Sequence, residues 1–392
     1  MRLASTLFSM LILTACCGAG PASAPSSSAD EGEAVLAKTM HFFLSRQRPD
    51  GSFKLDEREP PALTGMVLRA MALDPAIGAK TPEAKKAIAY LLATQKPDGG
   101  IYDQMIGNYS TALCVSGLAS VNDPALKDPI AKAIGYLKDG QWTDTIAAGR
   151  GQKVDPNSPL FGGWNYGGSG RRSGRADLSN TAQVLAALKD AGVSKDDPAY
   201  QNALKFASRL QNNTESNSAR WASNDGGFIY NPGDNNAGDS PAGTYTGANG
   251  ERMVRSYGSM TYAGLETMLY AGLSKDDPRV KAAFNWIRSN WTLDEHPGMR
   301  VAGDPQAGVF YYYSVFARSM AAYGEPVITD KQGTTHDWRK ELIAKLATLQ
   351  KPDGSFEGTN QWMENDPMIA TCLAIAALEE AIGDQKANPN TK

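Results

Sequence analysis

The stretch Gln350-Lys-Pro-Asp-Gly-Ser-Phe356 decides the fold, because close copies of it recur along the chain. The copies are Gln47-Arg-Pro-Asp-Gly-Ser-Phe53 and Gln95-Lys-Pro-Asp-Gly-Gly-Ile101, with looser versions at 161–166 and 224–228. Pro-Asp-Gly favours a turn, since Pro restricts φ, Asp bonds back to the backbone and Gly accepts a left-handed conformation. Helical patterns precede the copies, for example over 81–94 and 337–349, with apolar residues at i, i+3 and i+4. The chain is therefore predicted to be a repeat array.

A second, more apolar helix is predicted after each turn. These helices align on a column at i, i+4 and i+7 that begins with Thr in five of six cases. The column members are Thr64/Leu68/Met71, Thr111/Val115/Leu118, Thr181/Leu185/Leu188, Thr261/Leu265/Met268, Tyr313/Ala317/Met320 and Thr371/Ile375/Leu378. The sequence thus predicts six helix pairs, of which the fifth departs furthest from the pattern.

The return connections are short and also repeat. Segments 191–198 and 271–278 both pass from Ala-Gly to Asp-Asp-Pro, which ends one helix with Gly and starts the next with an Asp N-cap and Pro. Charged helices alternate with apolar ones rich in small residues, as expected for an outer ring of six helices around an inner ring of six. An open solenoid is the alternative, but the pairs lack polar capping repeats, which favours closure.

The Gln…Asp-Gly-Ser-Phe phrases resemble the QW repeats of squalene–hopene cyclases and protein prenyltransferase β subunits. The resemblance covers roughly Glu33 to Gly383 and implies an all-α (α/α)6 toroid. It also implies that the Gln and the aromatic residue of each phrase tie the end of an outer helix to the following inner helix.

The N-terminus indicates export. Residues 1–15 have the pattern of a signal peptide, and Leu13-Thr14-Ala15-Cys16 resembles a lipobox in which Cys16 is lipidated. Residues 16–32 form an Ala/Pro/Ser-rich tether, 33–383 one toroid, and 384–392 a disordered tail. The expected location is a bacterial envelope, with the membrane reached only through the lipid anchor. Cleavage after the A-x-A site at 22–24 would instead give a secreted protein.

The composition excludes several classes of protein. Lysine and arginine number 39 against 42 acidic residues, a net charge of −3, so no basic surplus favours nucleic acid. The apolar fraction of 42% is too high for a disordered chain. Only Cys114 and Cys372 remain in the folded part, each in an apolar helical run, and both are predicted to be buried and unpaired.

Long connections lead into the inner helices over 141–176, 212–256, 291–309 and 357–365, so they gather on one face of the ring. Loop elaboration on one face of a repeat array indicates the binding face, and the N-terminal helix ends there favour anions. The predicted binding-face residues are Trp164, Tyr166, Arg171, Arg172, Arg175, Ser179, Asn180, Arg252, Arg255, Tyr257, Tyr311, Tyr312 and Trp362. An anionic head with an apolar tail would suit this set. Ordinary solvated loops are the alternative.

The resemblance supplies a test of cyclase chemistry. Class II terpene cyclases protonate an alkene with the middle Asp of Asp-x-Asp-Asp-Thr-Ala, and the matching stretch here is Asp177-Leu-Ser-Asn-Thr-Ala182. The proton-donor position is Ser179, whose hydroxyl is far too weak an acid. Asp177 and Ser179 are alternatively an N-cap and a first-turn residue.

No metal or other cofactor is predicted. Prenyltransferase zinc sites use an Asp and a Cys two residues apart with a His on a later helix, whereas Asp366 and Cys372 are six apart. The histidines, His41, His296 and His336, fall outside the inner helices. The remaining weak catalytic candidates are Asp177, Glu364 and Asp366.

Three functions stay open. The leading hypothesis is an exported protein that binds an isoprenoid, lipid-like or anionic ligand in or over the central cavity, with cyclase activity lost. The second is a terpenoid cyclase-like or other lipid-modifying enzyme with a relocated acid. The third is an interaction scaffold in the envelope.

Overall fold

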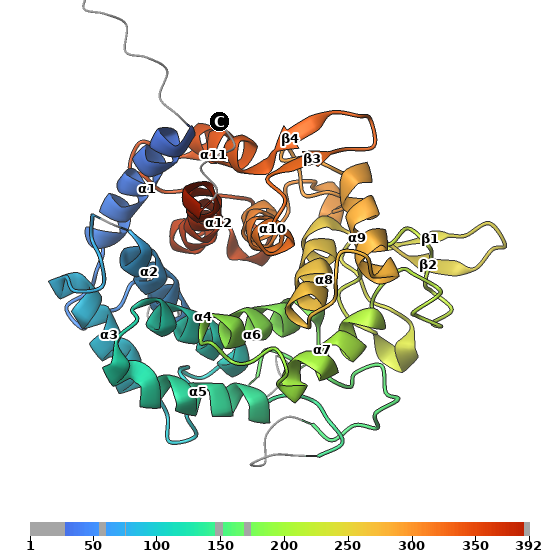
Figure 1. Ribbon diagram of the computed structural model, residues 1–392, viewed down its shortest axis with the longest axis horizontal. Coiled ribbons are helices and arrows are strands. Elements are labelled where there is room, and N and C mark those ends of the chain that lie inside the picture. Colours follow the sequence, from blue (N-terminus) through green and yellow to red (C-terminus); the bar gives the residue numbers. More distant parts are fainter. Residues whose placement is uncertain (1–27, 55–59, 75, 146–151, 168–173, 388–392) are drawn as a thin grey trace, which may run out of the picture.

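Twelve α-helices form two concentric rings in the computed structural model, which describes residues 28–54, 60–74, 76–145, 152–167 and 174–387 (Figure 1). The outer helices are α1 (Ser28–Leu44), α3 (Pro82–Thr94), α5 (Lys127–Asp139), α7 (Pro198–Ser208), α9 (Pro278–Ser289) and α11 (Trp338–Leu349). The inner helices are α2 (Ala62–Leu73), α4 (Gly107–Ser120), α6 (Leu178–Asp190), α8 (Gly258–Tyr270), α10 (Val309–Tyr323) and α12 (Pro367–Ala387). Because α12 packs against α2 and α11 against α1, the ring is closed. The predicted (α/α)6 toroid is confirmed.

Two short hairpins lie outside the rings. Strands β1 (Thr244–Thr246) and β2 (Arg252–Val254) pair antiparallel with Thr244 opposite Val254. Strands β3 (Val327–Thr329) and β4 (Thr335–Asp337) pair antiparallel between α10 and α11. Helix α1 begins at Ser28, inside the predicted tether, and α12 extends to Ala387, inside the predicted tail.

The outer helices start where the sequence places their N-caps. Thr81 caps α3 and Asp337 caps α11, each accepting a hydrogen bond from the backbone three residues on. Asp197 and Asp277 cap α7 and α9, and each is followed by Pro at the first helical position. The short return connections are thereby fixed by local chemistry.

The glutamine of the repeated phrase joins neighbouring outer helices, which corrects the expected link to the inner helix. Gln95 Nε2 donates to Gly99 O in its own turn and to Pro129 O at the start of α5, both at 2.9 Å. Gln47 makes the equivalent bond to Glu83 O at 2.8 Å, and Gln350 reaches Val35 O at 2.9 Å. The bond from Gln350 joins α11 to α1 and therefore seals the ring.

Two of these junctions use glutamines that the sequence pattern did not single out. Gln141 bonds to Gly162 O and Ala199 O, and Gln211 bonds to Gly226 O and Arg279 O, at distances of 2.8–3.0 Å. The glutamine lies far from its Gly in the sequence here, because a long loop separates them. In the folded chain, the looser copies of the phrase therefore also have a glutamine bound to the turn.

The link to the inner helix comes from a backbone N–H of the phrase and the Thr column. Phe53 N donates to Thr64 Oγ1 at 3.0 Å, and Phe356 N donates to Thr371 Oγ1 at 2.9 Å. The same bond starts from Ile101, Trp164 and Phe228. An aliphatic Ile101 is therefore tolerated, because the bond uses its main chain.

The fifth helix pair departs from the pattern, but its inner helix is still hydrogen-bonded to the outer layer. Tyr313 occupies the Thr position, and its hydroxyl donates to Leu293 O at 2.6 Å. The longer side chain reaches a loop that lacks the Pro-Asp-Gly turn, so the inner helix is still tied to the outer layer.

The turn glycine allows the outer helices to approach each other. Gly354 has φ +88°, and a Cβ there would lie 2.2 Å from Lys38 O of α1. A side chain would therefore meet both an unfavourable backbone conformation and a backbone clash. This explains why Gly is required at the third position of Pro-Asp-Gly.

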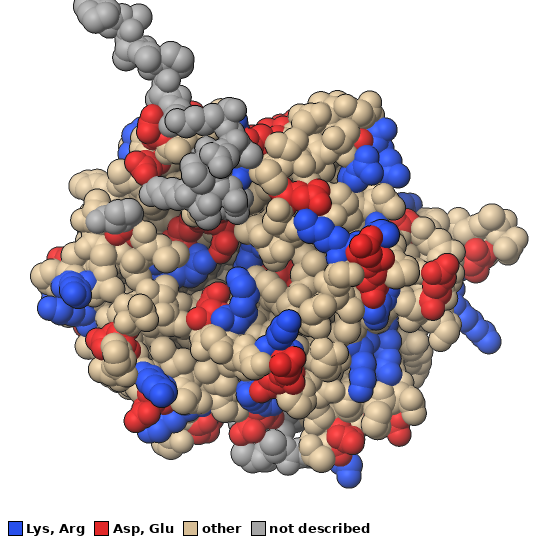
Figure 2. Space-filling view, viewed as in Figure 1, with Lys and Arg blue, Asp and Glu red and all other residues tan. Residues whose placement is uncertain are grey.

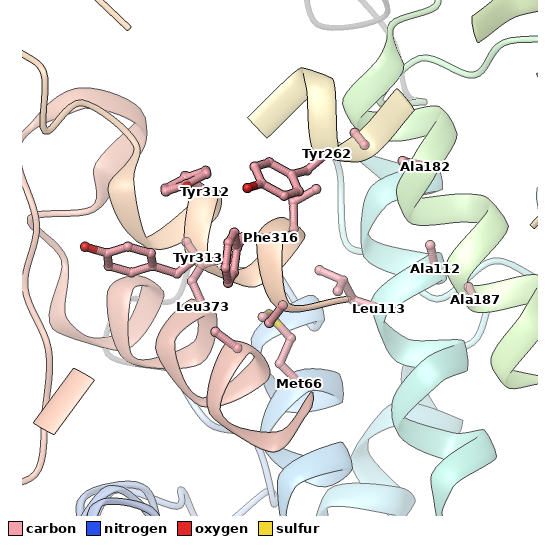
Figure 3. Packing of buried hydrophobic residues seen from close by; sticks show 14 of the residues in the cluster. Met66, Ala112, Leu113, Ala182, Ala187, Tyr262, Tyr312, Tyr313, Phe316 and Leu373 are labelled. Carbon is pink, nitrogen blue, oxygen red and sulfur yellow. The ribbon is translucent and has the colours of Figure 1, made fainter. Parts of the chain in front are cut away.

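The apolar core lies between the rings and on the inner faces of the inner helices. Figure 3 shows Met66, Leu113 and Leu373 pointing from three inner helices toward the middle of the ring. Cys114 and Cys372 are both buried, as predicted, and burial raises the pKa of Cys114 well above its usual range.

Candidate functional site

A cavity of about 50 Å³ lies at the centre of the inner ring. Five inner helices contribute stripes of residues at i, i+3 or i+4 spacing, so the cavity extends along the inner faces of these helices, and we call this space the central channel. Its polar lining residues are Arg69, Tyr109, Ser116, Gln183, Asp190, Tyr311, Ser314, Arg318, Glu379 and Glu380. The apolar ones are Met66, Leu113, Ala186, Leu373 and Ala376.

One layer of this channel follows directly from the repeat. The residue five places after the first member of each column faces inward, and the six residues are Arg69, Ser116, Ala186, Glu266, Arg318 and Ala376. The sequence interpretation followed the column itself, which packs outward. Reading five residues further would have found a charged inner layer.

Arg318 and Glu266 form a buried ion pair across α10 and α8. Arg318 Nε lies 2.5 Å from Glu266 Oε1, and its Nη1 donates to Gln183 Oε1 at 3.1 Å. Burial raises the pKa of Glu266, whereas the guanidinium of Arg318 opposes that shift. The positive charge of Arg318 and the negative charge of Glu266 therefore compensate each other within the channel.

Arg69 holds a second cluster, with α12. Its guanidinium contacts Glu379 Oε2 and lies 2.6 Å from Glu380 Oε1. Burial raises the pKa of Glu379 to about 7; Arg69 opposes this, while the charges of Glu380 and Asp190 add to it. Glu379 is thus a carboxyl that titrates near neutral pH.

Among the described residues that line the cavity, two buried polar atoms have no hydrogen-bond partner. They are Glu379 Oε1 and Ser116 Oγ. The side chain of Glu379 is only 5% exposed, and Ser116 is equally buried. An unsatisfied buried polar group is unfavourable by about 1–3 kcal/mol, so both atoms point to a missing partner.

The proton-donor position lies at the other end of the channel. Ser179 Oγ is 2.6 Å from Tyr311 Oη, which joins the first turns of α6 and α10. Asp177 is the N-cap of α6, and its carboxylate accepts bonds from Asn180 N and Asn180 Nδ2, both at 2.8 Å. Burial raises the pKa of Asp177 to about 7, although the bonds from Asn180 oppose this.

The other two candidate acids are caps as well. Glu364 accepts from Tyr311 N at 2.8 Å and Phe310 N at 3.2 Å, in the first turn of α10. Burial raises the pKa of Glu364 to about 7. Asp366 accepts from Met368 N at 2.8 Å at the start of α12. These contacts satisfy helix N-termini and leave the acid groups facing backbone.

Comparison with known families now identifies the chain. A family profile described as the prenyltransferase alpha-alpha toroid domain matches residues 178–381, just over half of the sequence. The chain belongs to this toroid family. A profile of the squalene-hopene cyclase C-terminal domain matches residues 54–157. A search of curated proteins finds no significant match.

Solved structures with several activities share the fold of this toroid protein. A D-mannose isomerase superposes with a TM-score of 0.58 at 14% identity, covering 92% of this chain and 100% of its own. The type II terpene cyclase MstE from Scytonema gives 0.51 at 12% identity, covering 91% and 99%. An alpha-1,6-mannanase from Salegentibacter gives 0.52 at 12%, covering 91% and 99%. At these identities the likeness shows the fold alone.

Several predicted binding-face aromatics lie in the core of the toroid. Trp164 is fully buried, and its Nε1 donates to Leu137 O at 2.6 Å. Tyr312 is also fully buried and donates to Thr292 O at 2.7 Å, and Tyr257 is 3% exposed. Their side chains pack between loops and helices. Tyr166 is half-buried beside Tyr109, with ring centroids 5.8 Å apart.

The described arginines of the predicted set do not converge on the channel. Arg171 and Arg172 lie outside the described residues. Arg175 pairs with Asp234, Arg252 donates to Ala237 O at 2.6 Å, and Arg255 stacks on Tyr245 at 4.9 Å. Trp362 is 50% exposed at the loop face. Of the predicted set, Ser179 and Tyr311 come closest to the centre, with Asn180 buried behind them.

The described residues contain no group of three or more His, Cys, Asp and Glu side chains placed to hold a metal ion. His296 is instead a buried cap: Ser259 N donates to its Nε2 at 3.0 Å, and burial lowers its pKa to about 4. On the face shown in Figure 2, acidic and basic side chains are intermixed. That distribution agrees with the balanced composition.

Proposed function

We propose that this toroid protein binds a small polar ligand in its central channel and does not cyclise polyprenes. The observation that carries the proposal is the channel itself. About 50 Å³ is far below the roughly 300–1,000 Å³ of pockets that enclose drug-sized ligands. A folded polyprene needs at least that larger space, whereas a group of a few heavy atoms needs less.

The residue at the proton-donor position supports the loss of cyclase chemistry. Ser179 contributes a hydroxyl, and that hydroxyl is already hydrogen-bonded to Tyr311. Protonation of an alkene needs a strong, neutral carboxylic acid. The nearby carboxyl of Asp177 is bound to Asn180 and faces the start of α6 instead.

The lining distinguishes among the ligand classes that the sequence left open. Charged and amide groups of Arg69, Gln183, Arg318 and Glu379 line the channel together with apolar residues. An isoprenoid would leave Glu379 Oε1 and Ser116 Oγ without a hydrogen-bond partner, which is unfavourable. A polar ligand is therefore favoured over an isoprenoid or lipid-like one, and ligand binding over a purely structural scaffold.

A general acid is the second candidate role, and Glu379 is its best-placed carrier. Its pKa of about 7 is matched to acid–base chemistry at neutral pH, and one carboxyl oxygen has no partner among the described residues. Asp177, Glu364 and Asp366 do not line the cavity, and none of their oxygens is a buried atom without a partner. If the protein is an enzyme, the relocated acid is Glu379.

We also propose that the protein is exported and anchored through Cys16. This residue lies outside the described part of the chain. Within the described part, no helix combines the length and apolarity needed to cross a bilayer. The proposal rests on the lipobox-like sequence alone.

A pair of assays tests the proposed function. Purified protein incubated with squalene and with a shorter polyprene should yield no cyclic product. Thermal-shift screening with small polar compounds should find a stabilising ligand, and Ala186→Leu should abolish its effect by filling the channel. Ala186 is 3% exposed and lines the cavity. Cyclisation by the unaltered protein would overturn the proposal, and its loss in Glu379→Gln would identify the acid.

A further inference from the structure

We infer that the channel mouth formed by the C-terminal ends of the inner helices binds a small organic cation through a primary ammonium group. Glu379 Oε1 and Ser116 Oγ would receive the N–H groups. The inference rests on the proposed function, because it names the ligand class for the same channel.

The unsatisfied atoms require a ligand that donates. Glu379 Oε1 is a buried carboxylate oxygen without a partner among the described residues, and an ionised carboxylate only accepts hydrogen bonds. Ser116 Oγ, on α4, is likewise buried and unpartnered, and a hydroxyl accepts as readily as it donates. Both line the same cavity, although they come from helices on either side of α2. A tetrahedral ammonium carries three N–H donors and can serve two such acceptors at once.

The charges around the channel mouth also favour an organic cation as the ligand. Three carboxylates, Asp190, Glu379 and Glu380, surround the single guanidinium of Arg69. Arg318 is already compensated by Glu266, so the mouth keeps an excess of negative charge. Asp190 is the last residue of α6, and the C-terminal ends of the six parallel inner helices add partial negative charge at this face. An anion would meet repulsion here.

An organic amine fits better than a metal ion. No metal-binding group of His, Cys, Asp and Glu is present among the described residues. The cavity of about 50 Å³ has room for an ammonium head and little more. The rest of a linear ligand would extend past Asp190, which is exposed to solvent.

Calorimetric titration of the full chain at pH 8 tests the inference, with 1,4-diaminobutane as the probe. 1,4-Butanediol and succinate match its length while replacing the ammonium groups by neutral and anionic ones. We expect the diamine to bind at least tenfold more tightly than either. Glu379→Gln should weaken binding at least tenfold, whereas Glu325→Gln should not. Glu325 is a control because it pairs with Lys275 at an exposed position and lies outside the channel lining.

Ser116→Ala is the variant that separates binding from folding. It removes an unsatisfied hydroxyl, so the thermal midpoint should stay the same or rise, while diamine binding weakens severalfold. Unchanged diamine affinity in both Ser116→Ala and Glu379→Gln would overturn the inference.

Two further results would distinguish a failure of the inference from a failure of the proposed function. If butanediol or succinate binds more tightly than the diamine, and Ala186→Leu abolishes that binding, the cation assignment fails and the channel remains a ligand site. If no small probe binds but a polyprene does, both fail together.

Discussion

Glu379→Gln is expected to stabilise the protein at pH 8 and to have a much smaller effect at pH 5. Burial raises the pKa of Glu379 from 4.5 to about 7 in the folded protein. Between these two values the folded chain holds a proton that the unfolded chain has released. Stability therefore falls as the pH rises from about 4.5 to about 7, and it levels off above that. Glutamine has the shape of the protonated acid and carries no charge, so it removes this dependence.

The size of the effect follows from the shift. Raising the pKa from 4.5 to about 7 is a change of about 2.5, and each unit corresponds to 1.36 kcal/mol, which gives about 3 kcal/mol at pH 8. The ion pair with Arg69 is already included, because it opposes the upward shift. Arg69 keeps Glu380 as a partner in the variant.

Urea denaturation followed by circular dichroism at pH 5, 6, 7 and 8 measures the difference. The gap between Glu379→Gln and the unaltered protein should widen from pH 5 to pH 7 and then level off toward pH 8. Glu325→Gln should track the unaltered protein throughout, since its carboxylate is exposed. A variant that is less stable at pH 8, or a gap that does not change with pH, would show that Arg69 keeps Glu379 ionised.

Three other predictions concern the ring, the lost acid and the N-terminus. Gln350→Ala should lower the free energy of unfolding by about 1–3 kcal/mol, and Gln95→Ala should lower it by the same amount, because each substitution breaks one outer-helix junction. In urea melts, a much smaller effect at position 350 would contradict ring closure. Ser179→Asp combined with Asn180→Asp should not restore cyclisation of squalene, because the cavity of about 50 Å³ cannot hold it; a cyclic product detected by gas chromatography would refute this volume argument. Mass spectrometry of the mature protein should find an acylated N-terminal Cys16; an unmodified chain starting at Pro25 would leave plain secretion.

Most of the fold could be predicted because each repeat contains the local sequence signals that determine its helices and turns. Asp-Pro starts, Gly ends and Pro-Asp-Gly turns act within a few residues, so the predicted helices 81–94 and 337–349 match α3 and α11 with their N-caps. The direction of the glutamine link was wrong. Sequence spacing shows that Gln95 follows a helix, but only packing shows that its amide reaches Pro129 of the next outer helix.

The proposed channel site was not found from the sequence for a related reason. Acids beside the start of an inner helix, such as Asp177 and Glu364, look like functional groups but satisfy unpaired backbone N–H groups. The channel charges instead lie within apolar helices and far apart in sequence. Arg69 and Glu379 are separated by most of the chain and meet only because the ring closes.

The sequence by itself determined the repeat, the number of helix pairs and the identity of the residue at the lost acid position, because turns, caps and periodicity act over short distances. Tertiary structure alone decided what the centre of the ring contains. Its width depends on how closely six helices approach, and the charge of each lining group depends on which neighbours desolvate or pair with it. Burial and the charges of Glu380 and Asp190, opposed by Arg69, raise the pKa of Glu379 to about 7, and no property of that residue in the isolated sequence distinguishes it from an exposed glutamate.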